Sequence, residues 1–509
     1  MVDSHSWFVP GDVFAVKLIS PTLRTVSRHC GVVLVLLLSI AVRAAWADSV
    51  AESHVLADVV AQIDAGQFVA SRAAIDHALA TEPPPSGEFR NSLEFQRERM
   101  RRILLDFTLS EDAVKAKLRE SIPDLSDAEF AAWKTAGLFE TQIVDGRTLY
   151  FHLAPSNLFR LSEQARQRRK IQKPFNDSPL QVAHPHHREV VAAAQASGRA
   201  DRLAPRRVRV TQSLTVHADA VPAGKLVRAW IPYPRAIAGQ QEDIRFVASE
   251  PKAHTIAPEE VLQRTAFMEK VAKAGAPTKF SITYDLTIYA QHHAIDADKI
   301  VPATITAELA PFVAERPPHI VFTQDLRVFS RQIVGDERNS WRIAQKLYAA
   351  VDQIPWAGAR EYSTLTNISD YSLHAGHADC GQQTLLLMTL LRLNGIPSRW
   401  QSGMIFSDGE YNDLHDWGWL YIAPYGWLPM DVTFGHLDSA DQAVANFYLG
   451  GLDAYRIAFN DDYSAEFVPA KKFFRSEPVD LQRGEAEWDG GNLYFDQWDY
   501  DFAWAIRAK

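Results

Sequence analysis

Apolar and polar residues follow two different periods along this chain. From about residue 50 to 175, apolar positions recur at helical spacing, so we expect mostly helices there. From about 206 to 310 they alternate with polar positions, which predicts strands separated by turns and hence a β-sandwich. The part that begins near Pro317 opens with helices and ends in strands. The pattern therefore predicts an α+β protein with a helical N-terminal domain, a β-sandwich and a mixed C-terminal domain.

We place the domain boundaries where these periods change. The helical domain with its linker covers residues 48–200, the β-sandwich 201–316, and the mixed domain with a C-terminal strand extension 317–509. The linker, at about 165–205, is basic, polar and proline-containing, and it holds His184-Pro-His186-His187. Such a cluster could bind a metal, but in a linker it is more often solvated, so we predict no metal site and no cofactor.

Local signals mark several elements of the helical domain. Ser110 and Ser126 are predicted N-caps, each followed by acidic residues in the first turn. Residues 139–151 predict a β-hairpin around Asp145-Gly146. The helices predicted on either side of Asp64–Gln67 resemble one tetratricopeptide-type hairpin, which would offer a surface for a protein partner.

The N-terminus has the pattern of a secretory signal peptide. Arg24 and Arg28 precede the apolar run Gly31–Val42, and Ala45-Trp46-Ala47 is a small-x-small cleavage pattern. We therefore predict that residues 1–47 are cleaved near Ala47 and that the protein is exported, to the periplasm or outside the cell. The alternative is an uncleaved membrane anchor. No later run is long and apolar enough for a transmembrane span.

Charge and cysteine content narrow the function. Four of the 53 basic and two of the 62 acidic residues lie in 1–47, which leaves 49 basic against 60 acidic residues and gives no reason to expect nucleic-acid binding. Of the two cysteines, Cys30 lies in the predicted signal peptide, so Cys380 would be the lone thiol of the mature chain. In an oxidising compartment such a thiol is either deeply buried or retained for its chemistry.

The sequence around Cys380 places this thiol at the start of a buried helix. Asp379 is a predicted N-cap, and Gln382 completes a capping box. A leucine-rich stretch follows, and Asn394-Gly395 ends it. Free N–H groups and the helix dipole at this position favour a thiolate of lowered pKa and can receive an oxyanion. The alternative interpretation is an inert, buried cysteine.

A predicted hairpin supplies the groups that would act on this thiol. Residues 414–422 alternate, with His415 on the same face as the tryptophans at 417 and 419. If Ile422 faced Trp427 in the returning strand, Asp431 would face Gly418 and could reach the imidazole. We therefore predict Cys380 as nucleophile, His415 as general base and Asp431 as the acid that orients it. Asp416 is a nearby rival, but alternation points it away from the face of His415.

These positions together resemble the transglutaminase-like core of the papain-like thiol superfamily. The matching positions are Asp379-Cys-Gly, Leu393-Asn-Gly-Ile-Pro-Ser-Arg-Trp400, Gly403, His415-x-Trp417, Gly426-Trp427 and Asp431-x-Thr433. The resemblance covers about residues 320–440 and implies a Cys-His-Asp triad on a helix start and two successive strands. Asp416 departs from the family pattern, in which the position after the histidine is usually small. The preceding β-sandwich resembles a domain that often accompanies such cores.

The resemblance implies a thiol acyl enzyme that attacks amide bonds of protein or peptide substrates through an acyl-thioester. Hydrolysis is slightly favoured, because many bacterial members are thought to be hydrolases, and a protein-glutamine amine transferase is the alternative. A peptidase acting on peptidoglycan is a weaker option that rests on location alone. A different class, a non-catalytic binding or assembly module, also fits helical hairpins and a β-sandwich.

Overall fold

The computed structural model describes residues 50–82, 84–170, 181–408 and 412–507. The chain separates into two compact units, and the boundary between Gln96 and Arg97 falls within a helix, α3 (Gly87–Asp106). The predicted signal peptide, residues 1–47, lies outside the described residues. Among the helices in the described part of the chain, none has the length and apolar character needed to cross a membrane.

The first unit consists of helices. Residues 50–64 are helical, α2 (Phe68–Leu79) follows, and the first part of α3 completes the unit. Val59, Ile63, Phe68 and Ile75 are buried, as the helical spacing of apolar residues predicts. The two predicted helices and the break between them are confirmed.

The second unit starts with short helices and a hairpin. The elements are α4 (Glu111–Ser121), α5 (Asp127–Thr135), β1 (Thr141–Val144), β2 (Arg147–Tyr150), α6 (Ala154–Leu161) and α7 (Glu163–Arg168). Ser110 and Ser126 cap α4 and α5 as predicted, and Ser126 forms a capping box with Glu129. Asp145 and Gly146 have φ values of 47° and 81°, which the tight turn between β1 and β2 requires.

Part of the predicted linker is instead a packed helix, α8 (Pro185–Ser197). His186 and His187 are only 9% and 3% exposed, so the prediction of a solvated histidine cluster is wrong. Pro185 starts the helix, and Val190 and Val191 bury its apolar face in the core of the sheets. His187 Nε2 lies 3.0 Å from the Tyr448 hydroxyl, and the Ala454 N–H donates to His186 Nε2. Among the described residues, no three histidine, cysteine or acidic side chains are grouped to hold a metal ion.

Two sheets pack face to face around one apolar core. One has the order β12-β8-β3-β16, with β5 also paired to β8, and the other has the order β15-β14-β4-β7-β6. Their strands are β3 (Leu203–Val216), β4 (Leu226–Pro232), β5 (Gln241–Glu250), β6 (Thr255–Ile256), β7 (Thr265–Val271), β8 (Thr278–His292), β12 (Gly451–Leu452), β14 (Glu485–Trp488), β15 (Gly491–Leu493) and β16 (Trp498–Arg507).

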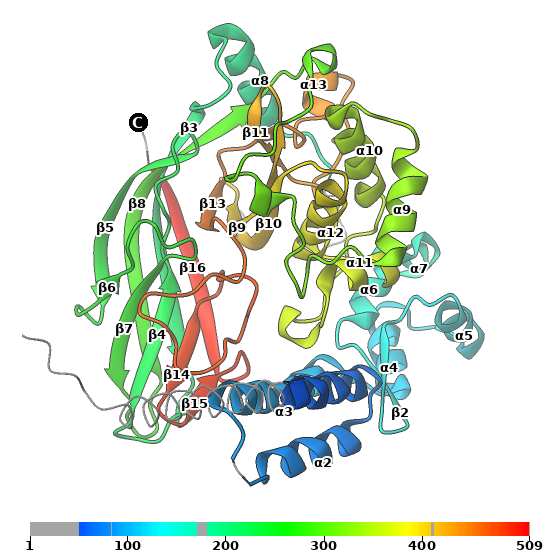
Figure 1. The fold of residues 1–509 in the computed structure, drawn as a ribbon, viewed down its shortest axis with the longest axis vertical. Coiled ribbons are helices and arrows are strands. Elements are labelled where there is room, and N and C mark those ends of the chain that lie inside the picture. The colour runs from blue at the N-terminus through cyan, green and yellow to red at the C-terminus, as the bar shows by residue number, and fades with distance from the viewer. Residues whose placement is uncertain (1–49, 83, 171–180, 409–411, 508–509) are drawn as a thin grey trace, which may run out of the picture. The chain divides into compact units, whose positions relative to one another are not determined.

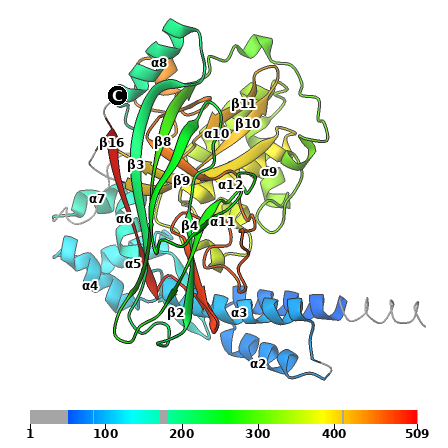
Figure 2. The same ribbon diagram turned by 90° about the vertical axis from the view of Figure 1, so that its left-hand side faces the viewer.

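The C-terminal strands complete this sandwich. β16 pairs with β3 along its whole length, and β14 pairs with β4, so the red strands lie among the green ones in Figures 1 and 2. The sequence predicts these strands as an extension of the last domain. Their partners are more than 250 residues away along the chain, so local patterns cannot show the pairing. The predicted boundary at 316 therefore separates strands that share a sheet.

A third sheet, of order β11-β10-β9-β13, carries the candidate site. Its strands are β9 (Ser398–Phe406), β10 (Asn412–Ile422), β11 (Gly426–Met430) and β13 (Arg456–Asn460). The helices near it are α9 (Gln324–Val334), α10 (Ser340–Asp352), α11 (Ile368–His374), α12 (Cys380–Leu393) and α13 (Gln442–Ala445). The predicted mixed fold of N-terminal helices and several sheets is confirmed.

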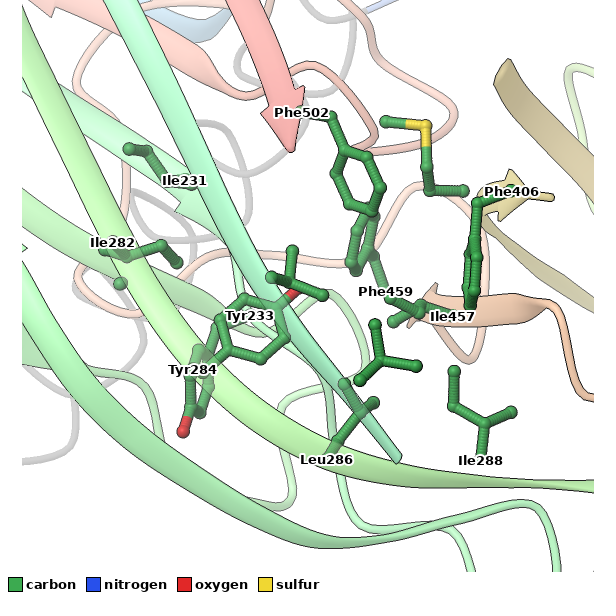
Figure 3. Close-up of a cluster of buried hydrophobic side chains, with 14 of the residues drawn as sticks. Ile231, Tyr233, Ile282, Tyr284, Leu286, Ile288, Phe406, Ile457, Phe459 and Phe502 are labelled. Carbon is green, nitrogen blue, oxygen red and sulfur yellow. The ribbon is translucent and has the colours of Figure 1, made fainter. Parts of the chain in front are cut away.

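One face of this third sheet contacts both the helices and the sandwich. Trp400, Met404 and Phe406 alternate along β9 and so point to the same face. Trp400 packs with the leucines of α12, whereas Met404 and Phe406 join the core of the sandwich. Figure 3 shows Phe406, Ile457 and Phe459 of this sheet near Ile288 and Leu286 of β8 and Phe502 of β16. The third sheet and the sandwich therefore share one core.

Gly403, in the middle of β9, leaves no room for a side chain. A Cβ there would meet the carbonyl oxygen of Ile457 and the amide nitrogen of Phe459, both backbone atoms of β13. We predict that Gly403→Ala lowers the free energy of unfolding by about 1–3 kcal/mol, because backbone atoms in a paired strand cannot move aside easily. Thermal unfolding measures the effect. Gly87→Ala, where an added methyl meets nothing within 4 Å, is the control, and equal stabilities of the two variants would contradict the prediction.

Candidate active site

Cys380 is the first residue of α12. The Asp379 carboxylate accepts the Gln382 N–H at 2.9 Å, and the Gln382 side chain accepts the Asp379 N–H, so the predicted capping box is present. The helix ends at Leu393, and Gly395 follows with φ +72°. The sequence prediction of this helix, its cap and its end is confirmed, and the thiol lies in the first turn.

The hairpin of β10 and β11 differs from the predicted register by one residue. Ile422 pairs with Gly426, which has φ +85° and closes a shorter loop, and Gly418 pairs with Met430. Asp431 therefore follows the last paired residue of β11. Because side chains alternate along a strand, Asp431 points to the same face as Trp427 and His415.

On this face, Asp431 forms a buried ion pair network with His415. His415 Nε2 lies 2.7 Å from Asp431 Oδ2, as the sequence argument expects for these two residues. Arg456 of β13 donates to the same carboxylate oxygen at 2.8 Å, and Tyr348 donates its hydroxyl proton to the Asp431 carbonyl at 2.6 Å. Asp431 is fully buried and His415 almost so. The imidazole is thus fixed through Nε2, which leaves Nδ1 as its second ring nitrogen.

Arg456 balances two buried carboxylates. Besides Asp431, it contacts Asp453 with Nη2 at 2.5 Å, and Tyr448 donates to Asp453 as well. Burial raises the pKa of Asp431, but the charges of His415 and Arg456 outweigh burial and hold this pKa below its ordinary value. The pKa of Asp453 is lowered in the same way, chiefly by Arg456 acting against burial. Both acids are therefore ionised near neutral pH.

Cys380 contacts the other face of the sheet. Its Sγ–H donates to Asp416 Oδ2 at 3.2 Å, and the Thr384 hydroxyl donates to the Asp416 carbonyl. Asp416 and His415 are neighbours along β10 and therefore point to opposite faces of the sheet. Leu420 and Ile422 lie on the same face as Asp416 and pack against the leucines of α12. The structure therefore joins His415 to Asp431 but gives the thiol a different partner. No Cys380–His415 hydrogen bond is present among the described residues.

Asp416 is surrounded by groups from two further segments, one with Gln482 and one with Tyr362. Gln482 Nε2 donates to Asp416 Oδ1 at 2.8 Å and to the His415 carbonyl at 3.0 Å. The Tyr362 hydroxyl lies 2.8 Å from Asp379 Oδ1 and 3.4 Å from Asp416 Oδ2. A Cβ at Gly381 would meet both the Tyr362 hydroxyl and Asp416 Oδ2, which explains why glycine follows the cysteine.

The electrostatics at Cys380 oppose those predicted from its helix position. Burial, followed by the charges of Asp416 and Asp379, raises the pKa of the Cys380 thiol well above its ordinary value. Burial also raises the pKa of Asp379 to about 7. The prediction of a lowered thiol pKa is wrong for this arrangement, because burial and the acidic neighbours outweigh the dipole of one helix.

One short segment links the two faces. Asp431 contacts His415, and two residues later the Thr433 hydroxyl donates to Gln383 Oε1 of α12 at 2.7 Å. The chain thus passes from the face of His415 to the helix that carries Cys380. On that side of β10, pairing with β11 starts at Gly418, so His415 and Asp416 lie beyond the paired stretch.

Sequence reasoning missed Arg456, Asp453 and Gln482, which hold these groups in place. Arg456 and Asp453 lie three residues apart, a spacing common to many surface ion pairs and therefore uninformative. Gln482 belongs to a segment without helix or strand, more than sixty residues after its partners. The sequence offers no local signal for either contact.

The charge of Arg456 should stabilise the fold, because it pairs with two buried carboxylates. We expect Arg456→Met to lower the free energy of unfolding by about 3–5 kcal/mol near pH 7, because two buried carboxylates lose their cation. A carboxylate whose folded pKa is lowered stabilises the fold above its ordinary pKa and loses that contribution as the pH falls. The stability deficit of the variant should therefore shrink towards pH 4, because without the guanidinium, burial raises the pKa of Asp431 and Asp453 and both take up protons in the variant.

Urea unfolding at several pH values from 4 to 8 measures this dependence. Arg245→Met is the matched control, since its 71% exposed side chain also pairs with an aspartate, Asp285, and should cost less than about 1 kcal/mol. A deficit for Arg456→Met that is independent of pH would contradict the role given to its charge.

Two solved structures are similar to this chain. A structure from Cytophaga hutchinsonii, provisionally named a cysteine protease, is 13% identical with a TM-score of 0.40 and covers 60% of this chain and 92% of its own. A provisionally named protease from Parabacteroides distasonis is 9% identical with a TM-score of 0.19, covering 51% and 68%.

The search of curated proteins found no match to this chain. Residues 327–432 match the model of the transglutaminase-like superfamily. This region includes α12, β10 and β11 and with them Cys380, His415 and Asp431. The chain therefore carries a transglutaminase-like domain at residues 327–432.

Proposed function

We propose that the transglutaminase-like domain is a thiol acyl enzyme that attacks amide bonds of protein or peptide substrates. Cys380 is the nucleophile, His415 the general base and Asp431 the group that orients the imidazole. The acyl-thioester passes to water in the slightly favoured reaction and to an amine in the alternative. The observation that carries this proposal is the buried His415–Asp431 pair, 2.7 Å apart and anchored by Arg456.

The contact between His415 and Asp431 assigns the ring nitrogens. With Nε2–H donating to Asp431, Nδ1 is the ring nitrogen that is free to accept a proton whenever the imidazole is neutral. Nδ1 takes the proton of the thiol, and the thiolate attacks the carbonyl carbon of the amide. The tetrahedral intermediate collapses as the C–N bond breaks and the imidazolium returns its proton to the leaving amine. Water then attacks the thioester with His415 as base, which releases the acid and restores the thiol.

The first turn of α12 supplies candidate donors for the oxyanion. The Asp379 side chain takes the Gln382 N–H, and the Asp379 carbonyl takes the Gln383 N–H. The N–H groups of Cys380 and Gly381 precede these in the same turn and are the candidates to stabilise the oxyanion.

This mechanism requires the thiol to exchange its partner. In the structure Cys380 donates to Asp416, so the thiol must turn from Asp416 towards His415 before proton transfer. Two observations support a route around the edge of β10. Pairing with β11 starts only at Gly418, and the segment from Asp431 to Thr433 joins the imidazole to α12.

A non-catalytic binding or assembly module is the second candidate function. The contact of Cys380 with Asp416 and the raised pKa of its thiol favour this alternative, because both oppose a thiolate. We also propose that the protein is exported to the periplasm or outside the cell, with cleavage near Ala47. The N-terminal signal-peptide pattern supports export, and so does the presence of a single cysteine in the predicted mature chain. A protein partner of the N-terminal helices also remains a proposal.

Substitution of the nucleophile tests the enzyme proposal. We expect Cys380→Ala to lower amide cleavage of a casein-like protein by a factor on the order of 10³ or more, because no other group replaces the thioester. His415→Ala should lower amide cleavage by a similar factor. Fragments and ammonia are measured with and without a primary amine, and incorporation of that amine identifies a transferase.

The controls separate loss of chemistry from loss of structure. Thermal unfolding of Cys380→Ala should match that of the wild type, and Asp438→Asn, at an exposed carboxyl that does not act on the thiol, should keep full activity. Equal cleavage, ammonia release and amine incorporation by the wild type and Cys380→Ala would exclude the thiol mechanism and leave the binding module.

A further inference from the structure

Asp416 joins the Cys380 thiol to the C-terminal part of the chain. Its carboxyl receives the Cys380 S–H on Oδ2 and the Gln482 amide on Oδ1. The Asp416 side chain is 2% exposed, and it lies between its own strand, the first turn of α12 and the segment 476–485. A carboxyl with this many fixed contacts cannot follow the thiol when the thiol moves.

A second carboxyl, Asp480, acts on Asp416: burial is the largest cause that raises the pKa of Asp416, and the charge of Asp480 is the next. Two interacting buried carboxyls do not both ionise easily, so the pair is expected to hold one proton near neutral pH. Asp480 is 4% exposed and lies two residues before Gln482, so one short segment brings both partners to Asp416.

Charged and titratable groups reach this cluster from every neighbouring element. On β10 this is Asp413, at the N-cap of α12 it is Asp379, and at the short helix at 362–364 they are Glu361 and Tyr362. The segment 476–485 adds Glu477 and Arg483, and Arg475 precedes it. The two arginines also serve other acids, since Arg483 pairs with Glu361 at 2.6 Å and Arg475 lies near Glu485.

We propose that Asp416 is a positioning residue that holds Cys380 as an S–H donor in the resting protein, with Asp480 sharing its proton and Gln482 fixing its orientation. This inference rests on the proposed function, in which Cys380 is the nucleophile. The resting thiol is then uncharged and turned away from His415. A substrate that enters the site must replace the Sγ–Oδ2 contact before the imidazole can take the proton.

The resting contact has a chemical consequence for an exported protein. Thiolates, rather than thiols, react with oxidants and disulfides. A thiol that stays protonated until substrate arrives is protected in an oxidising compartment. The raised pKa of the Cys380 thiol agrees with this state.

Two isosteric substitutions separate this role from a general effect of negative charge. In Asp416→Asn the remaining charge of the pair lies on Asp480, away from the thiol, so the thiolate should form more easily. In Asp480→Asn the charge lies on Asp416, in contact with the thiol, which should form its thiolate less easily. Each variant removes one carboxyl from the same pair, yet we expect opposite changes.

Alkylation by iodoacetamide measures the thiolate in the full-length protein. Carbamidomethylation at Cys380 is followed by peptide mass from pH 5 to 10 in the wild type and both variants. At pH 7.5 we expect Asp416→Asn to react about tenfold faster, with its pH profile moved down by about one unit. Asp480→Asn should react at least about threefold slower, and Asp438→Asn should match the wild type.

The proposal is overturned if Asp416→Asn reacts no faster than the wild type, or if both variants change in the same direction. If Asp416→Asn does not fold, as thermal unfolding would show, Asp480→Asn decides alone. Slower alkylation then supports the proposal, and equal or faster alkylation overturns it. This outcome is independent of the cleavage assay with Cys380→Ala, so failure of the proposed function can be told from failure of the resting contact.

Discussion

Strand β10 carries two ionisable side chains in succession, and the organisation of the site follows from their alternation. Successive side chains of a strand point to opposite faces, so His415 and Asp416 cannot serve the same network. His415 contacts Asp431 and, through it, Arg456. Asp416 contacts Cys380 and the C-terminal segment. Cys380 and His415, the proposed nucleophile and base, lie on two faces and can meet only around an edge of the sheet, where β11 leaves β10 unpaired.

The two networks neutralise their buried acids in different ways. On the face of His415, Arg456 lies between Asp431 and Asp453 and keeps both ionised. On the face of Cys380, acids outnumber cations, and burial raises the pKa of Asp480 to about 6 and that of Asp379 to about 7. On the second face protonation neutralises part of the buried negative charge, whereas on the first face the guanidinium of Arg456 neutralises it. The first network is fixed across the neutral range, whereas the second can change its charge there.

The sequence was most informative where the relevant interactions are local. The cap at Asp379, the end of α12 at Gly395 and the hairpin of β10 and β11 depend on neighbouring residues, and the sequence predicted all three. The register was wrong by one residue because the conformation of Gly426 decides the loop length. Even so, the contact of Asp431 with His415 was expected, since both predicted and observed pairings place the two residues near each other.

Local sequence patterns did not predict the interactions between distant segments. The histidines of α8 were expected in solvent, but Val190 and Val191 pack this helix on the sheets and bury His186 and His187. Arg456 and Gln482 gave no signal either. The lowered pKa expected for Cys380 rested on the helix alone, whereas burial and the acids Asp416 and Asp413 of β10 and Asp379 at the N-cap of α12 raise it. A first-turn cysteine therefore predicts thiol chemistry only when its tertiary neighbours are known.

The C-terminal segment connects the site to the sandwich. Residues 476–485 bring Asp480 and Gln482 to Asp416, and the same segment is fixed by Glu485, whose carboxylate accepts the N–H groups of Ser476 and Glu477. Glu485 begins β14, which pairs with β4. The partners of Asp416 are thus in place only when the last strands have joined the sandwich. Removal of these strands would leave a buried carboxyl without its amide donor, so the sandwich is part of what determines the state of the thiol.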